Sequence, residues 1–405
     1  MKKVLLSAPI LTRSGYGEHA RFVFQSLKTN PDIDLYVMPL NWGQSNWVYE
    51  DTEERLEIDG YIQKAAQSDG NFDISIQVTI PNEWVKAAPI NIGVCAGIET
   101  DKVSMAWLKK ANEMDKVIVV SNHAKDTFTK AKYSLGQFSN SESITYKCET
   151  PVEVVHYGVK NVVPTELDLE LENDFNFLTV AQLGPRKNLE NTVRWFVEEF
   201  IDEELGLVIK GHWMNNSLID RRKMTQVLQS LLEEYEDRKC SVHLLHGNMS
   251  DEEIHGLYVH PKIKAYMTAT HGEGFGLPIF EAAYSGLPVV APSWSGQVDF
   301  LSAPVKNEKS GKVKRKALYE KVGYELKTPE KEALWKEVIE PDVKWCYPKE
   351  DRFKTALRNV YRSNGIKKKD ALLLQEHLLN TFKLEDKLAE FNNIIEEIGD
   401  TNETF

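Results

Sequence analysis

Residues 270–292 read THGEGFGLPIFEAAYSGLPVVAP, and this stretch gives the strongest single indication of how the chain folds. The apolar run IKAYMTA at 263–269 precedes it and predicts a buried strand. Gly274 and Gly276 then allow a tight turn, and Pro278 suits the first turn of a following helix. The order of strand, glycine-rich turn and helix is typical of parallel α/β sheets, whose ligands bind at the carboxyl ends of the strands.

Two glutamates flank this turn, Glu273 before it and Glu281 on the expected helix. A carboxylate in the turn can accept hydrogen bonds from sugar hydroxyls, and one on the helix can bind the diol of a ribose. Backbone N–H groups between them, at a helix N-terminus, favour a diphosphate. A purely structural alternative makes Glu273 a helix cap and Glu281 a solvent-exposed residue. The glycine-rich context between the two glutamates disfavours it.

Short apolar runs alternate with helical patterns along the first part of the chain. Strands are predicted at 4–10, 34–40, 74–80, 90–96, 116–122 and 152–158, with helices at 19–28, at 104–114 and from His123. The stretch 161–175 is acidic, has no sustained apolar periodicity and suits a linker. This alternation of strands and helices implies βαβ units and a parallel sheet.

A second alternating series follows the linker and contains the opening stretch. Strands are predicted at 175–183, 205–211, 241–247, 263–269 and 287–292, with helices at 188–200, 217–236 and 250–258 and at the 270–292 motif. From Ala371 onward the pattern is that of a long amphipathic helix. The chain therefore predicts two Rossmann-like halves joined by the linker.

Composition narrows the possible functions. The 405 residues, 42% of them hydrophobic, are enough for two or three domains with sizeable cores. No apolar run is long enough to span a membrane, and the apolar start of the chain is interpreted as a first strand rather than a signal peptide. Four dispersed cysteines without metal-ligand spacing indicate reduced thiols and a cytoplasmic protein. A net charge of −12 argues against a general polyanion binder.

The 270–292 stretch closely resembles the EGFGLPxxEAxxxGxPVV signature of retaining GT-B glycosyltransferases of glycosyltransferase family 4. SGYGEHAR (14–21) is similar to the first glycine loop of that family, and VAQLGPRKNLE (180–190) to its phosphate loop. The stretches at 94–128 and 152–159, which include Glu99 and VEVVHYGV, also resemble family segments.

The resemblance implies a GT-B fold: two Rossmann-like domains with parallel sheets facing a central cleft, and a C-terminal helix packing back across the lobes. We therefore expect an acceptor-side domain at 1–162, a linker at 163–175 and a donor-binding domain at 176–380. The donor-binding domain carries an insertion near 303–345, and residues 381–405 form the C-terminal helix and tail.

The resemblance also implies roles for individual residues. Glu273 and Lys187 are the expected catalytic residues: Glu273 would hydrogen-bond the transferred sugar, and Lys187 would neutralise the diphosphate leaving group as its charge develops. The arginine that family members carry upstream of this lysine is Gln182 here, while Arg186 stands next to Lys187. The donor-binding residues implied are Gly15, Gly17, Gln182, Arg186, Lys187, Gly274, Phe275, Gly276, Leu277 and Glu281.

On the acceptor side the implied residues are Tyr16, His19 and Glu99, the last near the position of a histidine in the family. No metal is expected, because the only DxD pattern considered, Asp32-Ile33-Asp34, reads as a solvated turn. No cofactor is expected either, since the nucleotide-sugar donor is itself a substrate.

The sequence thus predicts a retaining glycosyltransferase that moves a sugar from a UDP- or GDP-sugar to a hydroxyl of a glycan or lipid-linked sugar. A phage-type DNA base glycosyltransferase acting on hydroxymethylated pyrimidines stays open, because residues 303–369 hold nineteen Lys and Arg against ten Asp and Glu. A nucleotide-sugar epimerase on the same scaffold and a non-catalytic sugar-nucleotide sensor are further alternatives. The donor, the acceptor and the oligomeric state are not specified by the sequence.

Overall fold

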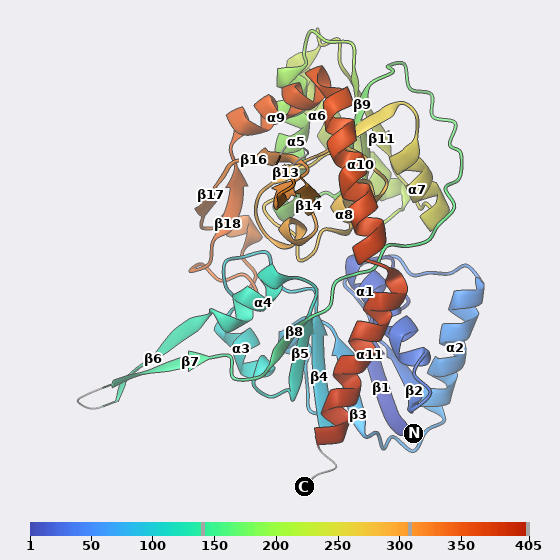
Figure 1. The fold of residues 1–405 in the computed structure, drawn as a ribbon, viewed down its shortest axis with the longest axis vertical. Coiled ribbons are helices and arrows are strands. Elements are labelled where there is room, and N and C mark those ends of the chain that lie inside the picture. Colours follow the sequence, from blue (N-terminus) through green and yellow to red (C-terminus); the bar gives the residue numbers. More distant parts are fainter. Residues whose placement is uncertain (139–141, 307–309, 402–405) are drawn as a thin grey trace. The chain divides into compact units, whose positions relative to one another are not determined.

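The computed structural model describes residues 1–138, 142–306 and 310–401, and its contacts divide the chain into two units. Unit 1 contains Met1–Gly158, Pro329–Val343 and Leu384–Phe405, and unit 2 contains Val159–Thr328 and Lys344–Lys383. Each unit is built on a six-stranded sheet (Figure 1).

The sheet of unit 1 is parallel throughout, with strand order β2-β1-β3-β4-β5-β8. Its strands are β1 (Lys2–Ala8), β2 (Ile33–Pro39), β3 (Ile74–Val78), β4 (Ile90–Cys95), β5 (Lys116–Val119) and β8 (Val152–Val154). These are the six strands predicted for the first half, and their central residues are buried because apolar side chains fill both faces of the sheet.

Helices and a hairpin complete unit 1. They are α1 (Gly15–Lys28), α2 (Glu53–Ala66), α3 (Met105–Ala111), α4 (Asn122–Thr129), α11 (Leu384–Thr401) and the antiparallel pair β6 (Lys132–Phe138) and β7 (Glu142–Lys147). Helix α1 begins at Gly15, four residues before the predicted start, because the Ser14 hydroxyl accepts the Gly17 N–H at 3.0 Å and caps the helix. Helix α11 packs on α1, where the Phe22 and Phe391 rings lie 6.4 Å apart.

The sheet of unit 2 has the order β11-β10-β9-β12-β13-β16 and is also parallel. Its strands are β9 (Asn176–Gln182), β10 (Gly206–His212), β11 (Ser241–Leu245), β12 (Ile263–Met267), β13 (Val289–Pro292) and β16 (Glu320–Val322). The helices are α5 (Leu189–Glu199), α6 (Leu218–Leu232), α7 (Asp251–Val259), α8 (Leu277–Tyr284), α9 (Glu350–Arg362) and α10 (Asn364–Thr381). The first five strands match the predicted series.

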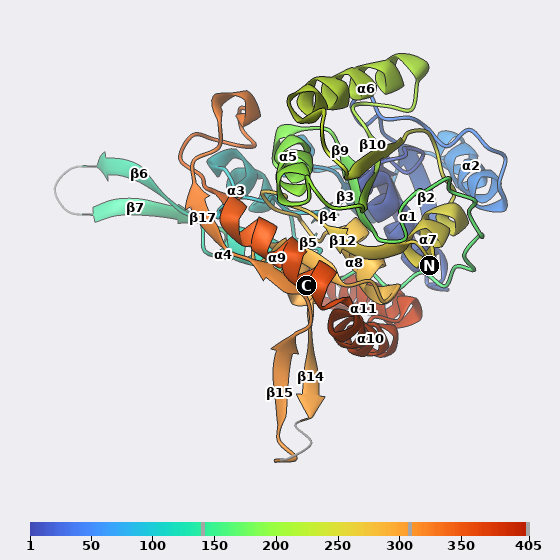
Figure 2. The ribbon, with the colours of Figure 1, turned by 90° about the horizontal axis from the view of Figure 1, so that it is seen from above.

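The predicted insertion at 303–345 divides into parts with different positions. Strands β14 (Ser302–Lys306) and β15 (Val313–Ala317) form an antiparallel hairpin that projects from unit 2 (Figure 2). Strand β16 extends the parallel sheet, and β17 (Tyr324–Lys327) pairs with β18 (Trp345–Pro348). Residues 307–309 of the insertion lie outside the described residues.

Two segments from late in the chain group with unit 1. Residues 329–343 lie within the predicted insertion of the 176–380 domain, and residues 384–401 lie within the predicted C-terminal helix and tail at 381–405. The predicted long helix from Ala371 is interrupted at Phe382 and Lys383, between α10 and α11. Residues 402–405 of the predicted tail lie outside the described residues. No helix in the described part of the chain combines the length and apolar character needed to cross a membrane.

Candidate active site

The candidate active site of unit 2 lies where two adjacent strands of the sheet end. Strand β9 leads into a short 3-10 turn at Pro185–Lys187, and β12 leads through residues 268–276 into α8. Because β9 and β12 pair in parallel, their carboxyl ends and the loops that follow meet at one edge of the sheet. The backbone ties the two loops together, since the His271 N–H donates to the Arg186 carbonyl at 2.8 Å.

Three charged side chains converge at this edge. The Lys187 ammonium lies 2.7 and 2.8 Å from the two carboxylate oxygens of Glu273. The Arg186 guanidinium donates from Nη1 to the same carboxylate at 3.1 Å and to the Gly272 carbonyl at 2.8 Å. The predicted catalytic pair, Lys187 and Glu273, is therefore brought into direct contact, with Arg186 beside it.

Glu273 is held rigidly in this cluster. Its residue is only 7% exposed, its backbone N–H donates to the Ser295 hydroxyl at 2.8 Å, and its carbonyl accepts the Gly296 N–H at 2.9 Å. Burial by itself would raise the pKa of the Glu273 carboxyl, but the charges of Lys187 and Arg186 outweigh it and hold that pKa below its ordinary value. Glu273 is therefore a carboxylate near neutral pH.

The turn between Glu273 and α8 takes the form that its glycines predict. Gly276 caps α8 in the left-handed conformation, with φ 99°, which a side chain with a Cβ rarely adopts. Pro278 lies in the first turn of the helix, and the Phe280 N–H closes that turn on the Gly276 carbonyl at 2.9 Å. Gly274, Phe275, Gly276 and Leu277 therefore line the positive end of the α8 dipole.

Glu281, on the second turn of α8, is half-buried and accepts a hydrogen bond from the Tyr258 hydroxyl at 3.0 Å. Tyr258 is buried on α7, and its burial and the neighbouring Glu281 charge raise the pKa of its hydroxyl well above the ordinary value. The tyrosine therefore stays neutral and fixes the carboxylate by donating to it. Sequence reasoning missed Tyr258, because nothing in the stretch around it indicates a contact with α8.

A second buried carboxylate organises the loop after β10. Asp220 accepts the backbone N–H groups of Trp213, Met214 and Asn215 at 2.9, 2.6 and 3.0 Å. His246, after β11, contacts the same carboxylate through Nε2 at 2.8 Å. Burial opposes the charged form of Asp220, but these hydrogen bonds prevail and lower its pKa to about 2.

Gln182, of the predicted site, and His271, in the loop before Glu273, have their side chains engaged by the protein. Gln182, at the end of β9, is exposed and donates to the Trp213 carbonyl at 2.7 Å. His271 is buried, contacts the Cys346 carbonyl through Nδ1 at 2.6 Å and lies against the rings of Trp345 and Tyr347. The histidine thereby anchors β18 to the active-site loop.

The predicted site residues of unit 1 lie at the start of α1. Gly17 is required there, because a Cβ at this position would lie 2.0 Å from the Thr12 carbonyl oxygen, whereas a Cβ at Gly15 would meet open space. Tyr16 is half-buried and stacks on Trp42 with ring centroids 4.1 Å apart. His19 is 2% exposed, and burial lowers the pKa of its imidazole to about 3, so the ring is neutral.

Glu99 follows β4 and is half-buried. The backbone brings its loop to α1, since the Ala96 N–H donates to the Tyr16 hydroxyl at 3.3 Å. Burial is the main cause of the raised pKa of Tyr16, and the Glu99 charge adds to it. The Glu99 carboxylate therefore helps to keep the Tyr16 hydroxyl neutral.

The structure also places the DxD pattern. Asp34 lies on β2, forms an ion pair with Lys64 and accepts a hydrogen bond from the Tyr36 hydroxyl at 2.9 Å. Across the described residues, His, Cys, Asp and Glu side chains form no group of three or more that could hold a metal ion.

With this geometry established, the site-bearing part of the chain can be compared with known proteins. Residues 168–337 match the family described as glycosyl transferases group 1. This stretch of the chain is similar to that family. The finding confirms the resemblance predicted from the 270–292 stretch.

Curated relatives match part of this chain. The serotype-specific mannosyltransferase WbdA of Escherichia coli is 33% identical over 118 residues, which are 28% of this chain and 13% of WbdA. The sucrose synthase of Denitrovibrio acetiphilus is 30% identical over 131 residues, which are 30% of this chain and 16% of that enzyme. The matched stretches are therefore a small part of both relatives.

Among solved structures, Anabaena Alr3699/HepE in complex with UDP and glucose superposes with a TM-score of 0.63. The match covers 98% of this chain and 100% of HepE at 14% sequence identity. It shows a common fold, and the predicted GT-B class is confirmed for the whole described chain.

The matched stretch contains the charged cluster but not the whole predicted site. Arg186, Lys187, Glu273 and Glu281 lie within residues 168–337, whereas the predicted acceptor-side residues belong to unit 1 and precede that stretch. The predicted donor-binding residues Gly15 and Gly17 also lie in unit 1.

Proposed function

We propose that the protein is a retaining glycosyltransferase that moves a sugar from a UDP- or GDP-sugar to a hydroxyl acceptor. The observation that carries the proposal is the contact of Lys187 and Arg186 with the buried Glu273 carboxylate beside the N-terminus of α8. Two cations and a helix N-terminus suit a diphosphate. A buried carboxylate next to them suits the hydroxyls of the sugar attached to it.

Donor binding changes the partners of these side chains. Without a donor, both cations contact Glu273. A bound diphosphate supplies oxygens to Lys187 and Arg186, and the Glu273 carboxylate then accepts hydrogen bonds from sugar hydroxyls. Glu281, oriented by Tyr258, is the proposed acceptor for the ribose diol.

In the proposed reaction, the bond between the sugar anomeric carbon and the β-phosphate oxygen breaks, and the acceptor oxygen bonds to that carbon on the same face. The acceptor proton passes to the departing phosphate, so no protein base is needed. Negative charge grows on the diphosphate as the bond breaks, and Lys187 and Arg186 stabilise it there. These two cations also underlie the proposal that the enzyme works without a metal ion.

The acceptor side and the cellular setting are also proposals. Tyr16, His19 and Glu99 remain the predicted acceptor-side residues, with Gly15 and Gly17 at the entrance to α1. The acceptor proposed is a glycan or a lipid-linked sugar, in keeping with a relative named as a mannosyltransferase. The four cysteines are free thiols, which supports the cytoplasmic location predicted from the sequence.

The experiment that tests this proposal is incubation with a panel of UDP- and GDP-sugars, with release of nucleoside diphosphate as the readout. We expect one or a few donors to be consumed. Glu273→Gln should change the ranking of sugars with the same nucleotide, because it alters hydroxyl recognition directly. Lack of binding and turnover for every donor would refute the proposal, and conversion of a donor to its epimer without an acceptor would replace it.

A further inference from the structure

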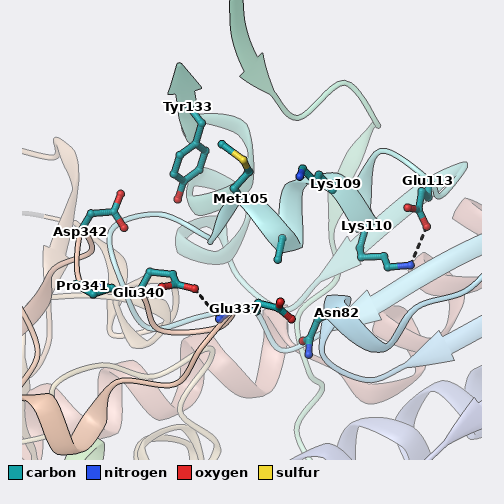
Figure 3. Close-up of a pocket in the computed structure, with 11 residues that line it drawn as sticks. Asn82, Met105, Lys109, Lys110, Glu113, Tyr133, Glu337, Glu340, Pro341 and Asp342 are labelled. Atoms are coloured by element: carbon teal, nitrogen blue, oxygen red, sulfur yellow. Dashed lines mark hydrogen bonds and ion pairs between the residues drawn. The ribbon is translucent and has the colours of Figure 1, made fainter. Parts of the chain in front are cut away.

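Unit 1 contains a cavity that none of the predicted site residues lines. Its volume is about 640 Å³ (Figure 3). It lies between the α3 surface, the start of β6 and a segment from late in the chain. The lining residues are Asn82, Met105, Ala106, Lys109, Lys110, Glu113, Tyr133, Glu337, Glu340, Pro341 and Asp342. Tyr16, His19 and Glu99 are not among them, so this cavity is separate from the predicted acceptor-side residues.

One wall of the cavity is the strap, which we define as residues 329–343. The Ser104 hydroxyl donates to the Glu337 carbonyl at 2.6 Å, and Lys102 forms an ion pair with Asp342 at 2.5 Å. Val338 is 3% exposed and packs in the core cluster of unit 1 that includes Trp107. The wall is therefore fixed to the unit that carries the rest of the cavity.

Two carboxylates of the cavity are held by contacts within the protein. Glu340 accepts the Glu337 N–H at 2.6 Å, and Lys110 pairs with Glu113 at 3.0 Å. These carboxylates are therefore acceptors held in place at the cavity wall.

The chemistry of the lining favours a neutral, polyhydroxylated ligand. Two lysines stand against four carboxylates, so the net charge is negative and a phosphate or another polyanion is disfavoured. Hydroxyl groups can both donate to the carboxylates and accept from Lys109. Met105, Pro341 and the Tyr133 ring add apolar surface suited to the C–H face of a sugar, and Figure 3 shows Met105 and Tyr133 on the same side of the cavity.

We propose that this cavity is a carbohydrate-binding site that holds neutral sugar units of the acceptor chain. The proposal rests on the proposed glycosyltransferase function, and it deepens that function by assigning an acceptor-side site beyond the residues around α1. Neutral or basic oligosaccharides are the class of ligand it takes. Phosphorylated and sulfated chains are excluded by the charge of the lining.

The test measures binding of neutral oligosaccharides to the full chain without any donor. The probes are linear hexasaccharides of mannose, glucose and N-acetylglucosamine, observed by saturation-transfer NMR and titration. Ala106→Trp places a bulky ring in the cavity. Ala66→Trp, at an exposed position on α2 outside the cavity, is the matched control. Thermal unfolding of each variant reports whether it is folded.

We expect at least one hexasaccharide to bind, with Kd raised about tenfold or more in Ala106→Trp. Ala66→Trp should bind as the parent does. Equal binding by parent and folded Ala106→Trp, or no binding of any hexasaccharide to the parent, would overturn the proposal. Saturable binding of a lysine-rich peptide in place of the sugars, lost in Ala106→Trp, would also overturn it and assign the cavity to a protein partner.

Failure of this site and failure of the proposed function are distinguishable. Saccharide binding is measured without a nucleotide. Nucleotide-sugar binding and turnover are measured both without a saccharide, where the sugar passes to water, and with the hexasaccharides as acceptors. Donor turnover without hexasaccharide binding rejects only the cavity assignment. Hexasaccharide binding without nucleotide-sugar binding or turnover in the presence of that hexasaccharide keeps the site and rejects the transfer reaction.

Discussion

The Glu273 carboxylate lies buried and in contact with two cations, Lys187 and Arg186. These contacts determine the pH range in which Glu273 is charged. Burial would raise the pKa of Glu273, but Lys187 and Arg186 lower it below the ordinary value. The charged form is therefore preserved as pH falls, until the lowered pKa is reached. Any change that removes one cation must move that pKa upward.

The first prediction follows from this balance. The positive charge of Lys187 is the largest of the effects that lower the pKa of Glu273. In Lys187→Ala this charge is absent, so burial raises the pKa of Glu273. The acid limb of kcat/KM for the donor should therefore lie at higher pH in Lys187→Ala than in the parent. A pH–rate profile of both proteins measures this displacement. Coincident acid limbs would show that the ion pair does not set the charge of Glu273.

The second prediction concerns Glu281, the proposed ribose ligand. Glu281→Ala should weaken UDP or GDP binding by about 1.5–3 kcal/mol, because a hydrogen bond to a charged acceptor is lost. Tyr258→Phe removes only the hydroxyl that donates to Glu281 at 3.0 Å, so its effect should be smaller. Titration calorimetry measures both, and thermal unfolding checks that the variants fold. Parental affinity in Glu281→Ala would remove this residue from the donor site.

At this scale the sequence could name candidate residues of the site but not the residues that hold them in place. Lys187, Glu273 and Glu281 could be named because each belongs to a short local motif next to a strand end. Ser295 and Tyr258 could not, since each reaches the site through a contact between elements that periodicity does not encode. The pairing of Lys187 with Glu273 depends on the adjacency of β9 and β12, which is a property of the sheet order.

Among the elements, the loop after β10 depends on a single carboxylate. Asp220 accepts three backbone N–H groups and has a pKa of about 2, below its ordinary value. A depressed carboxyl pKa contributes stability that is present above the unfolded-state pKa and is lost as pH falls toward the folded-state pKa. The relevant window therefore runs from about pH 4 down to about pH 2.

The third prediction uses that window. Asp220→Asn should lower the free energy of unfolding near neutral pH by about 1–3 kcal/mol, and the difference from the parent should shrink as pH falls through the window. Asp237→Asn, at an exposed position in the same unit, is the control. Denaturant unfolding at a series of pH values measures the difference. If the difference in unfolding free energy between Asp220→Asn and the parent stays constant down to the acid end of this pH window, the proposed role of the Asp220 carboxylate is contradicted.

Element boundaries were predicted well where periodicity was strong. The strands of both sheets followed apolar runs, whereas α1 began earlier than its apolar face because Ser14 caps it. The strands within 303–345 were not predicted. Most of β15 is exposed and basic, so it has no apolar alternation to identify it as a strand.

At the scale of the whole molecule, sequence order and spatial units do not coincide. The chain passes between the units at Gly158, Thr328, Val343 and Lys383. The predicted linker at 163–175 lies shortly after the first of these four positions. The strap could not be predicted, because its attachment depends on a few contacts, such as Lys102 with Asp342, between residues far apart in sequence.

The fourth prediction concerns the acceptor class and follows from total charge. Phosphate contacts dominate DNA affinity, and the chain carries a net charge of −12 despite its basic β14–β15 hairpin. We therefore expect no retardation of duplex DNA at physiological salt in a gel-shift assay. Salt-sensitive retardation that disappears in a Lys312→Glu, Lys314→Glu double variant would instead favour a DNA acceptor.

The central claim is that Lys187 and Arg186 stabilise a departing diphosphate, and donor turnover tests it most directly. For a donor that the parent consumes, we measure kcat for nucleoside diphosphate release in Lys187→Ala, Arg186→Ala and the double variant. Losing one preorganised electrostatic donor should lower kcat about 10²–10³-fold, with Arg186 covering part of the loss in Lys187→Ala. The account therefore predicts a larger loss in the double variant than in either single one. Near-parental kcat in a folded double variant would contradict it.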